Sequence, residues 1–401
     1  MNRFVQRSLR FAYGVARILG VMNLEIDFET GRARVTRRTT IYAAVMNVLT
    51  FSVLPLMLNL KQVVAVSCRV TLLHEYLFTF VVAIRIISIF VTIISRWIKK
   101  RRLLHIIRAV RHLKWRLLRQ APSDSRRATR AWQRGVIIKF MSATLAEMGF
   151  LMVAVYLVRE YLGLRLILGI FLIFMLMALL NSIIAQYYVA LLYVQVYHII
   201  LNEQLKDIVG EMRWLCRRQR NAQCMGVFVM KSCILTDRLT ELAQIQVKLQ
   251  KLCLLISTTF GIQVLSVTLV YYMSSIGAVY FFFSLYKHDE LRLGWSNLGL
   301  AFVVCSLIIY FVDMLITLRI KFFILDESAL MSRILEQYTL FSGLDARLEA
   351  AFKDFQLQVA RNPLKLPVYG LYNMDRPQMM ATFVSLLSHS ILLIQYDMKN
   401  Y

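Results

Sequence analysis

Two long runs without a charged residue constrain the fold more than any other feature of this chain. Residues 166–202 and residues 252–286 contain no Asp, Glu, Lys or Arg, and they are 37 and 35 residues long. A membrane crossing needs about 20 apolar residues, and the middle of the first run has no Gly or Pro at which the chain would turn back. Each run therefore predicts one helix that crosses a membrane and continues into a helical bundle outside it.

Shorter apolar segments predict five further membrane spans. They lie at about 41–60, 76–94, 136–158, 298–318 and 379–394. Charged residues make up 18% of the chain, whereas a soluble protein of ordinary composition has about 25%. The predicted fold class is all-α, a polytopic membrane protein with seven transmembrane helices, in which the long fourth and fifth helices form an intracellular anchor bundle.

The distribution of Lys and Arg predicts the orientation. The segments that connect the predicted spans lie alternately on the two sides of the membrane. Those on one side hold 39 of the 48 Lys and Arg residues, and those on the other side hold seven. Residues 96–134 alone carry 14 of them against a single acid, Asp124. Cytoplasmic loops are enriched in Lys and Arg, so we expect an intracellular N-terminus and an extracellular C-terminus. The net charge of +25 also fits nucleic-acid binding, but the charge lies between apolar spans, so no nucleic-acid partner is expected.

The spans divide the chain into four regions, and the helical spacing of apolar residues predicts amphipathic helices at 99–119 and 344–359. The first of these helices is expected at the membrane surface or against another intracellular helix. The regions are a cytoplasmic N-terminal segment (1–40), a six-helix transmembrane bundle (41–324) with intracellular extensions (loops 96–134 and 203–251), an intracellular anchor region (325–377), and a last transmembrane helix with a short extracellular tail (378–401).

No arrangement of residues points to catalysis. The six histidines are scattered, and no HExxH, P-loop, GxSxG or GxGxxG pattern occurs. Cys216, Cys224 and Cys233 are separated by seven and eight intervening residues, which is not the spacing of a zinc site. We therefore expect no enzymatic activity, no cofactor and no metal ion.

Four ionisable residues lie inside the predicted spans. Each costs about 2.5–3.5 kcal/mol at the middle of a membrane unless it is paired or hydrated. Lys139 lies near a cytoplasmic end and is expected to extend its amine towards the interface. Arg85, Glu147 and Asp313 are expected to face the interior of the bundle or a hydrated cavity. Two interpretations stay open, namely structural pairing, for example Arg85 with Glu147, and a ligand cavity in the outer half of the bundle.

Aromatic residues near the outward ends of the spans provide further candidates for that cavity. Tyr156, Tyr271 and Tyr272 combine an apolar ring with a hydroxyl group that can orient a ligand. Tyr271 and Tyr272 are expected to lie deeper than an interfacial aromatic belt. The alternative for each of them is packing against lipid or a neighbouring helix.

The C-terminal segment resembles a known family. Residues 370–372 read Gly-Leu-Tyr, and residues 388–396 read SHSILLIQY. The insect gustatory receptor family is similar, with a Gly-[Leu/Phe]-[Phe/Tyr] turn before a last helix that contains Thr-Tyr, five apolar residues and Gln-Phe. This chain keeps the spacing and the Gln, but it has Ser388, His389 and Tyr396 at the Thr, Tyr and Phe positions. The layout of the whole chain also agrees with that family.

This resemblance implies a ligand-gated cation channel. The family assembles as homo- or heterotetramers, in some cases with co-receptor subunits, and each last helix lines one central pore for permeant cations. The first six helices of each subunit would sense a small-molecule tastant, with bitter compounds among the candidates. The expected location is the plasma membrane of gustatory neurons, in dendrites and axons, where the other partners are membrane lipids.

The last helix can also be analysed from its residues. Ser388, Ile391, Leu392 and Gln395 share one face at helical spacing, and Tyr396 follows. If this face lines a pore, Ile391 and Leu392 form an apolar constriction that closes by dewetting, next to a ring of Gln395 amides. The alternative is a face that packs on neighbouring helices.

A second function class stays open on the sequence alone, a seven-helix receptor of the G-protein-coupled type without channel activity. Such a receptor requires an extracellular N-terminus. The distribution of the basic residues opposes that orientation. A membrane enzyme or transporter is a third possibility, but the chain shows neither a catalytic cluster nor an internal repeat.

Overall fold

The computed structural model is built almost entirely from helices, as the sequence predicts. It describes residues 3–27, 30–54, 72–120, 125–158, 164–219, 225–287, 297–340, 345–373 and 375–400. The all-α fold class is therefore confirmed. The helices are α1 (Arg3–Ile18), α2 (Arg37–Val53), α5 (Leu72–Ile98), α6 (Lys100–Gln120), α7 (Arg126–Val158), α8 (Leu164–Gln219), α9 (Met225–Lys287), α10 (Asn297–Glu336), α11 (Ala346–Arg361) and α12 (Arg376–Asn400), with a short 3₁₀ helix, η3 (Gln337–Leu340).

Six helices in the described part of the chain are long and apolar enough to cross a membrane. They are α5, α7, α8, α9, α10 and α12, and they contain the second to seventh predicted spans. The first predicted span, 41–60, begins in α2, and its residues 55–60 lie outside the described residues. The predicted polytopic architecture is thus confirmed.

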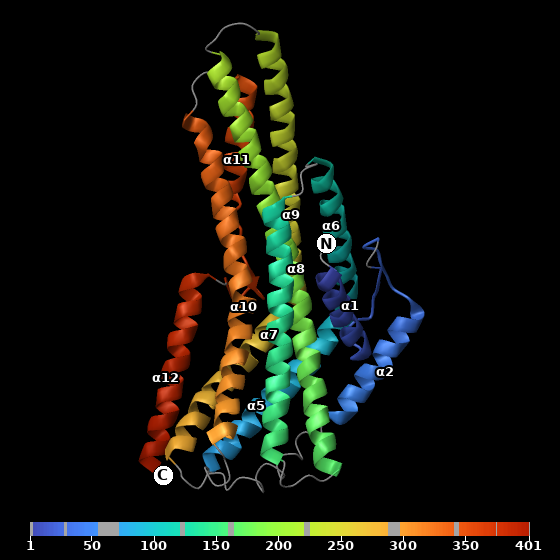
Figure 1. The fold of residues 1–401 in the computed structure, drawn as a ribbon, viewed down its shortest axis with the longest axis vertical. Coiled ribbons are helices and arrows are strands. Elements are labelled where there is room, and N and C mark those ends of the chain that lie inside the picture. The colour runs from blue at the N-terminus through green and yellow to red at the C-terminus, as the bar shows by residue number, and fades with distance from the viewer. Residues whose placement is uncertain are drawn as a thin grey trace.

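The two uncharged runs form single unbroken helices, as predicted. Helix α8 is 56 residues long and α9 is 63 residues long, so they extend about 84 and 95 Å. Figure 1 shows both helices passing from the lower bundle into an upper bundle that they share with α10 and α11. Side chains such as Leu239, Leu249 and Phe352 are fully buried there, because the apolar stripes of these helices face one another.

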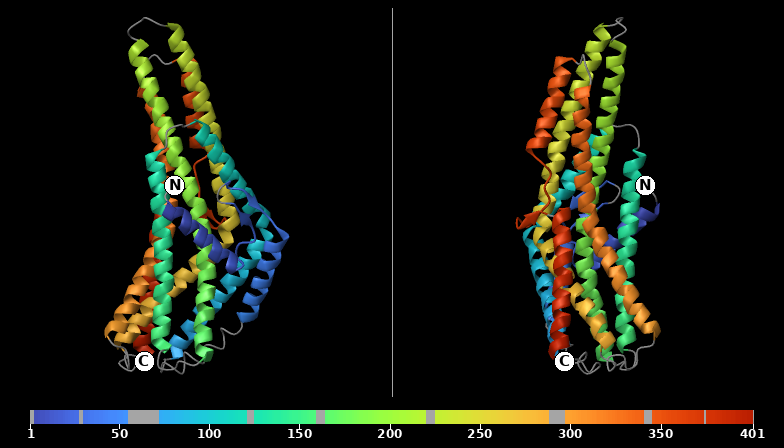
Figure 2. Two further views of the ribbon diagram at one scale, coloured as in Figure 1. Left: turned by 45° about the vertical axis from the view of Figure 1, so that its right-hand side comes forward. Right: turned by 90° about the vertical axis from the view of Figure 1, so that its left-hand side faces the viewer.

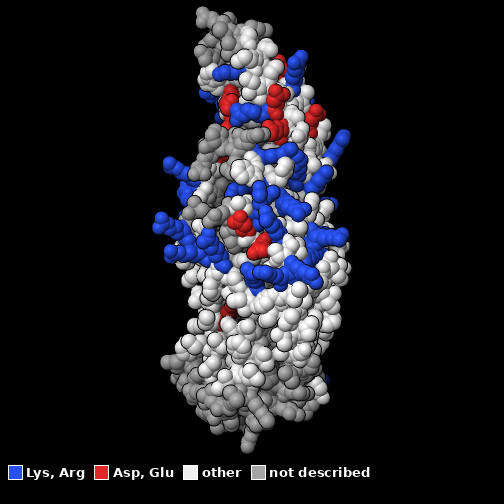
Figure 3. Space-filling model, turned by 90° about the vertical axis from the view of Figure 1, so that its right-hand side faces the viewer, with Lys and Arg blue, Asp and Glu red and all other residues white. Residues whose placement is uncertain are grey.

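The ends of the molecule differ in charge. Figure 3 shows Lys and Arg side chains gathered in a belt across the face that carries α2 and α6, with mostly uncharged side chains directly below it. The C-terminus lies at the lower end of the molecule, whereas the N-terminus lies at the level of α6 (Figures 1 and 2). This arrangement agrees with a cytoplasmic upper half. The four-region division of the chain stays a prediction, since α10 runs through residue 324 without a break.

The predicted amphipathic helices are present as α6 and α11. Helix α6 packs against α8 and α9, so it lies against other intracellular helices. Helix α11 starts at an N-cap, Asp345, whose carboxylate accepts the backbone N–H of Arg347 at 2.9 Å. Helix α1 is a difference from the sequence prediction, which gives residues 1–40 only as a cytoplasmic segment and predicts no helix there.

Two short antiparallel hairpins also occur. β1 (Glu25–Ile26) pairs with β2 (Ala33–Arg34), and β3 (Pro367–Val368) pairs with β4 (Tyr372–Asn373). The turn of the second hairpin includes Gly370 at φ +77° and Tyr369 at φ +51°. Gly370, which belongs to the predicted turn, thus has a left-handed backbone conformation that glycine adopts without steric cost. This turn contacts α9 at Gly261, where an added Cβ would lie 3.3 Å from the backbone nitrogen of Tyr369.

Two glycines in long helices should respond to substitution in opposite ways. Gly261→Leu is expected to destabilise the protein by about 1–3 kcal/mol, because the larger side chain must displace the backbone of the turn. Gly210→Ala on α8 is expected to stabilise it by about 0.5–1 kcal/mol, since no atom lies within 4 Å of the new methyl group. Thermal unfolding of the purified chain in detergent measures both changes, and a Gly261→Leu protein as stable as the wild type would contradict the contact.

Candidate functional site

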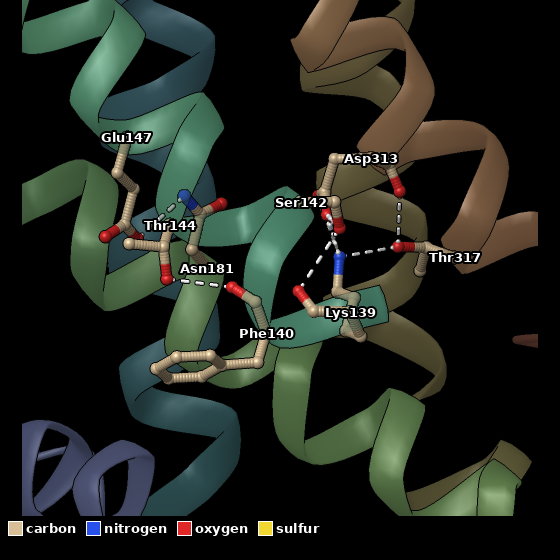
Figure 4. Close-up of polar contacts among 8 residues, drawn as sticks. All are labelled: Lys139, Phe140, Ser142, Thr144, Glu147, Asn181, Asp313 and Thr317. Carbon is tan, nitrogen blue, oxygen red and sulfur yellow. Dashed lines mark hydrogen bonds and ion pairs between the residues drawn. The ribbon is translucent and has the colours of Figure 1, made fainter. Parts of the chain in front are cut away.

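A buried ion pair joins α7 to α10 within the transmembrane bundle (Figure 4). The amine of Lys139 donates to both carboxylate oxygens of Asp313 at 2.7 Å and to the hydroxyl of Thr317 at 2.8 Å. The hydroxyl of Ser142 donates to Asp313 at 2.6 Å. Both charged side chains are 5% exposed. The prediction that Lys139 extends towards the interface is therefore wrong, because a carboxylate on another helix satisfies its charge inside the bundle.

Glu147 and Arg85 have separate partners. The amide of Asn181 donates to Glu147 at 3.0 Å, which links α7 to α8. The guanidinium of Arg85 donates to the hydroxyl of Ser274 and to the sulfur of Met177, both at 3.1 Å. The suggested pair of Arg85 with Glu147 is thus wrong. The Nε nitrogen of Arg85 is buried and has no hydrogen-bond partner in the described part of the chain. Arg85 can therefore donate a further hydrogen bond to an additional acceptor.

A cavity of about 40 Å³ lies between α8, α9 and α10. This volume is enough for about three water molecules. Tyr271 lines it, and the Tyr271 ring lies 5.1 Å from the ring of Tyr310. Gln263, two turns away on α9, and Lys321 on α10 also line the cavity, and they are 3% and 2% exposed. Most of the other lining side chains are apolar.

The sequence prediction missed Gln263 and Lys321. Lys321 lies three residues beyond the predicted sixth span, 298–318, so it is not among the ionisable residues predicted inside the spans. A signal was present, because two phenylalanines follow this lysine directly and its helix continues unbroken. Gln263 lies in the uncharged run of α9, where the sequence gives no indication of which residues face a cavity.

Only part of the predicted cavity set comes together. Arg85, Tyr271 and Tyr310 are neighbours around Ser274. Asp313 belongs to the ion pair with Lys139. Tyr272 faces α12 rather than the cavity. Tyr156 belongs to the last turn of α7, and its side chain lies outside the described part of the structure.

The last helix, α12, packs mainly against α9 and leaves one side open. Its buried residues are Leu386, Ser390 and Asp397, which lie along the side towards α9. The residues predicted for a pore are all exposed in the single chain, and Ile391 and Leu392 are 52% and 65% exposed. This exposed set is Ser388, Ile391, Leu392, Gln395 and Tyr396.

Two polar contacts tie α12 to α9. In the middle of the helix, the hydroxyl of Tyr272 lies 2.8 Å from the hydroxyl of Ser385 and 3.1 Å from Nδ1 of His389. His389 stands where the gustatory receptor pattern has tyrosine, so in this chain its ring supplies a contact to α9.

At the outer end, the carboxylate of Asp397 accepts the hydroxyl of Tyr280 at 3.0 Å and the amine of Lys287 at 3.2 Å. The Asp397 side chain is fully buried. Among the described residues, no group of three or more His, Cys, Asp or Glu side chains is placed to hold a metal ion.

Comparisons with known proteins agree with this geometry. The solved structure of the insect olfactory receptor OR5 from Machilis hrabei superposes with a TM-score of 0.66 at 12% identity, over 98% of this chain and 99% of that one. The structure of the same receptor in complex with eugenol superposes with a TM-score of 0.59 at 11% identity, over the same shares. These likenesses show the fold.

The sequence relatives are closer. Gustatory receptor 59d of Drosophila melanogaster is 35% identical over 406 residues, which cover 100% of both chains. Gustatory receptor 36c of the same species is 31% identical over 98% of this chain and 97% of the relative. A family model of the 7tm chemosensory receptors matches residues 9–400. The chain is a receptor rather than an enzyme, and it belongs to the 7tm chemosensory receptor family of insect gustatory receptors.

Proposed function

We propose that this receptor is a ligand-gated cation channel that opens when a small-molecule tastant binds. The observation that carries the proposal is the open side of α12. This side combines apolar residues, Ile391 and Leu392, with the polar side chains of Ser388 and Gln395. Polar groups at membrane depth are costly against lipid and favour water or a neighbouring subunit. A helix held on one side only, with such a face exposed, fits a position on the axis of a tetramer.

The gate in this proposal is the apolar part of that face. Four copies of Ile391 and Leu392 around one axis would form a dry constriction, which blocks ions by dewetting. The ring of Gln395 amides next to it would supply hydrogen-bonding groups to water and permeant cations. The tetramer would consist of identical subunits or would include co-receptor subunits, and its location would be the plasma membrane of gustatory neurons, in dendrites and axons.

The ligand side of the proposal rests on two adjacent tyrosines of α9. Tyr271 lines the cavity, and Tyr272 contacts Ser385 and His389 on α12. A ligand that displaces Tyr271 would therefore also move the contact to the pore helix. The cavity of about 40 Å³ must widen to admit a tastant, since binding pockets for small molecules measure about 300–1,000 Å³. The relative solved with eugenol supports a small organic ligand, and bitter compounds remain candidates.

Removal of the Tyr272 hydroxyl tests this coupling. Tyr272→Phe is expected to raise the agonist concentration for half-maximal current by about fivefold, because about 1 kcal/mol of hydrogen bonding to α12 is lost. Tyr42→Phe is the matched control, since the Tyr42 hydroxyl donates to the carbonyl of Ile18, away from α12. Equal responses of the two variants would argue against the coupling.

The proposal as a whole is tested by current recordings from the purified receptor in liposomes. Tastant panels should evoke a cation current without any added G protein, with co-receptor subunits included where the single chain is silent. A receptor of the G-protein-coupled type would give no current under these conditions. Silence of a correctly folded receptor, with and without co-receptors, would overturn the channel proposal.

A further inference from the structure

We propose that α1 is an interfacial helix that binds anionic phospholipid headgroups of the cytoplasmic leaflet. The helix covers Arg3–Ile18 and contains no acidic residue. It packs against α7 and α8 along one side, where Val5, Ser8 and Ala16 are buried. The remaining surface carries two distinct stripes, one apolar and one basic.

The apolar stripe consists of Phe4, Phe11 and Ile18, which are seven residues apart and therefore lie on one line along the helix. All three are exposed, by 48%, 63% and 58%. Two phenylalanines and an isoleucine in line on the surface of a single chain form an apolar strip that water solvates poorly. The tertiary fold leaves about half or more of each of these three side chains exposed, so the surroundings of the protein must cover this exposed part.

The depth of α1 identifies the bilayer as these surroundings. The ring of Phe11 lies 6.1 Å from the ring of Phe140, in an edge-to-face contact. Phe140 lies about 6 Å beyond the cytoplasmic start of the third span, 136–158, because each helical residue advances about 1.5 Å. The apolar faces of interfacial helices lie about 5–10 Å into the boundary between headgroups and acyl chains. Phe11 is thus at the depth of an interfacial helix.

A second contact fixes the C-terminal end of α1 at the same boundary. The hydroxyl of Tyr42 donates to the carbonyl of Ile18 at 3.0 Å, and Tyr42 lies at the cytoplasmic start of the first predicted span. Immediately after the helix, the guanidinium of Arg96 donates to the carbonyl of Val21 at 3.1 Å. These contacts hold the C-terminal end of the apolar stripe at the cytoplasmic surface of the membrane.

The basic stripe supplies the lipid specificity. Arg3, Arg10 and Arg17 are also seven residues apart, and each is exposed. At 100° per residue this line lies about 100° from the phenylalanine line on the helix surface. When the phenylalanines face acyl chains, the arginines therefore lie at phosphate level. The cytoplasmic leaflet contains anionic lipids that attract such residues, and guanidinium groups bind phosphate and carboxylate in a bidentate manner. Figure 3 shows that this level of the molecule carries the basic belt.

The test uses the full-length receptor, purified in detergent and incubated with phosphatidylserine and phosphatidylcholine of equal chain length. Native mass spectrometry then counts the bound lipids. The wild type should retain phosphatidylserine preferentially, and Arg3→Gln/Arg10→Gln/Arg17→Gln should lose at least about fivefold of that preference, the effect of one basic residue near an anionic surface. The matched control is Arg333→Gln/Arg347→Gln/Arg361→Gln, which removes three exposed arginines from α10 and α11 far above the membrane level, and it should retain the lipid as the wild type does.

Two further measurements keep the proposal falsifiable if the triple variant does not fold. Arg3→Lys/Arg10→Lys/Arg17→Lys should keep most of the preference, because the charge remains. Raising the salt concentration should release phosphatidylserine from the wild type. Equal retention by wild type and the glutamine variant, or an equal loss in the control, would overturn the proposal. A change of oligomeric state with unchanged lipid retention would instead assign the stripe to a second copy of the chain.

Discussion

Replacing Lys139 by methionine is expected to destabilise the receptor by about 3–5 kcal/mol, because it leaves the carboxylate of Asp313 buried without its positive partner. The pair is a strong candidate for such an effect, since both side chains are 5% exposed and the amine contacts both oxygens at 2.7 Å. Thermal unfolding of the purified chain in detergent should show a midpoint lower by about 5 °C or more.

Two comparisons isolate the cause. Lys353→Met removes a lysine from an exposed pair with Glu349 on α11, where the side chains are 55% and 42% exposed, and its effect should stay below about 1 kcal/mol. The double variant Lys139→Met/Asp313→Leu should recover much of the lost stability, because an apolar pair can replace a buried ion pair at little cost. If the Lys139→Met protein were as stable as the Lys353→Met protein, Lys139 and Asp313 would not stabilise the bundle together.

The hydroxyl groups around the pair support this recovery. Thr317 also donates to the backbone carbonyl of Asp313 at 2.9 Å, and Ser142 also donates to the carbonyl of Lys139 at 3.2 Å. Both acceptors are backbone groups, which the double substitution leaves in place. Neither hydroxyl is therefore left without a partner when the two charges are removed.

The sequence could predict those parts of the fold that depend on length and local period. The long helices α8 and α9 follow from uncharged runs that, as helices, are longer than a bilayer is thick. Such runs can be recognised in the sequence without any knowledge of how the helices pack. The orientation follows from the positions of the basic residues between spans. Helix α1 was missed because its two stripes repeat every seven residues among many arginines, and the segment was judged by its polarity rather than by its period.

The sequence could not predict which side chains meet across helices. Lys139 was expected to avoid the membrane interior because only its distance from the end of its own helix was considered. Its partner, Asp313, is 174 residues away, and no local pattern reveals such a partner. Tyr271 and Tyr272 were predicted as one pocket pair, yet neighbouring residues on a helix differ by 100° in direction. One therefore lines the cavity and the other contacts α12, a division that only the arrangement of the helices determines.

Replacing Ile391 by asparagine is expected to raise the current without ligand by at least about tenfold. An isoleucine side chain in a dry constriction contributes about 1.5–3 kcal/mol through apolar burial, and a loss of about 1.4 kcal/mol from the closed state changes the closed–open equilibrium tenfold. Currents from liposomes containing equal amounts of folded receptor measure this leak. The prediction rests on the exposure of Ile391, whose side chain lies on the open side of α12 and is 52% exposed in the single chain.

Ile308→Asn on α10 provides the matched control for this last prediction. Ile308 is 56% exposed and belongs to a helix with no part in the proposed pore. The same change of chemistry there should leave the leak unchanged, although it adds a polar group to a transmembrane helix. An equal leak in both variants would point to a general defect of the membrane domain. An unchanged leak in Ile391→Asn, with a normal amount of folded receptor, would show that the open face of α12 packs against a neighbouring helix instead of closing a pore.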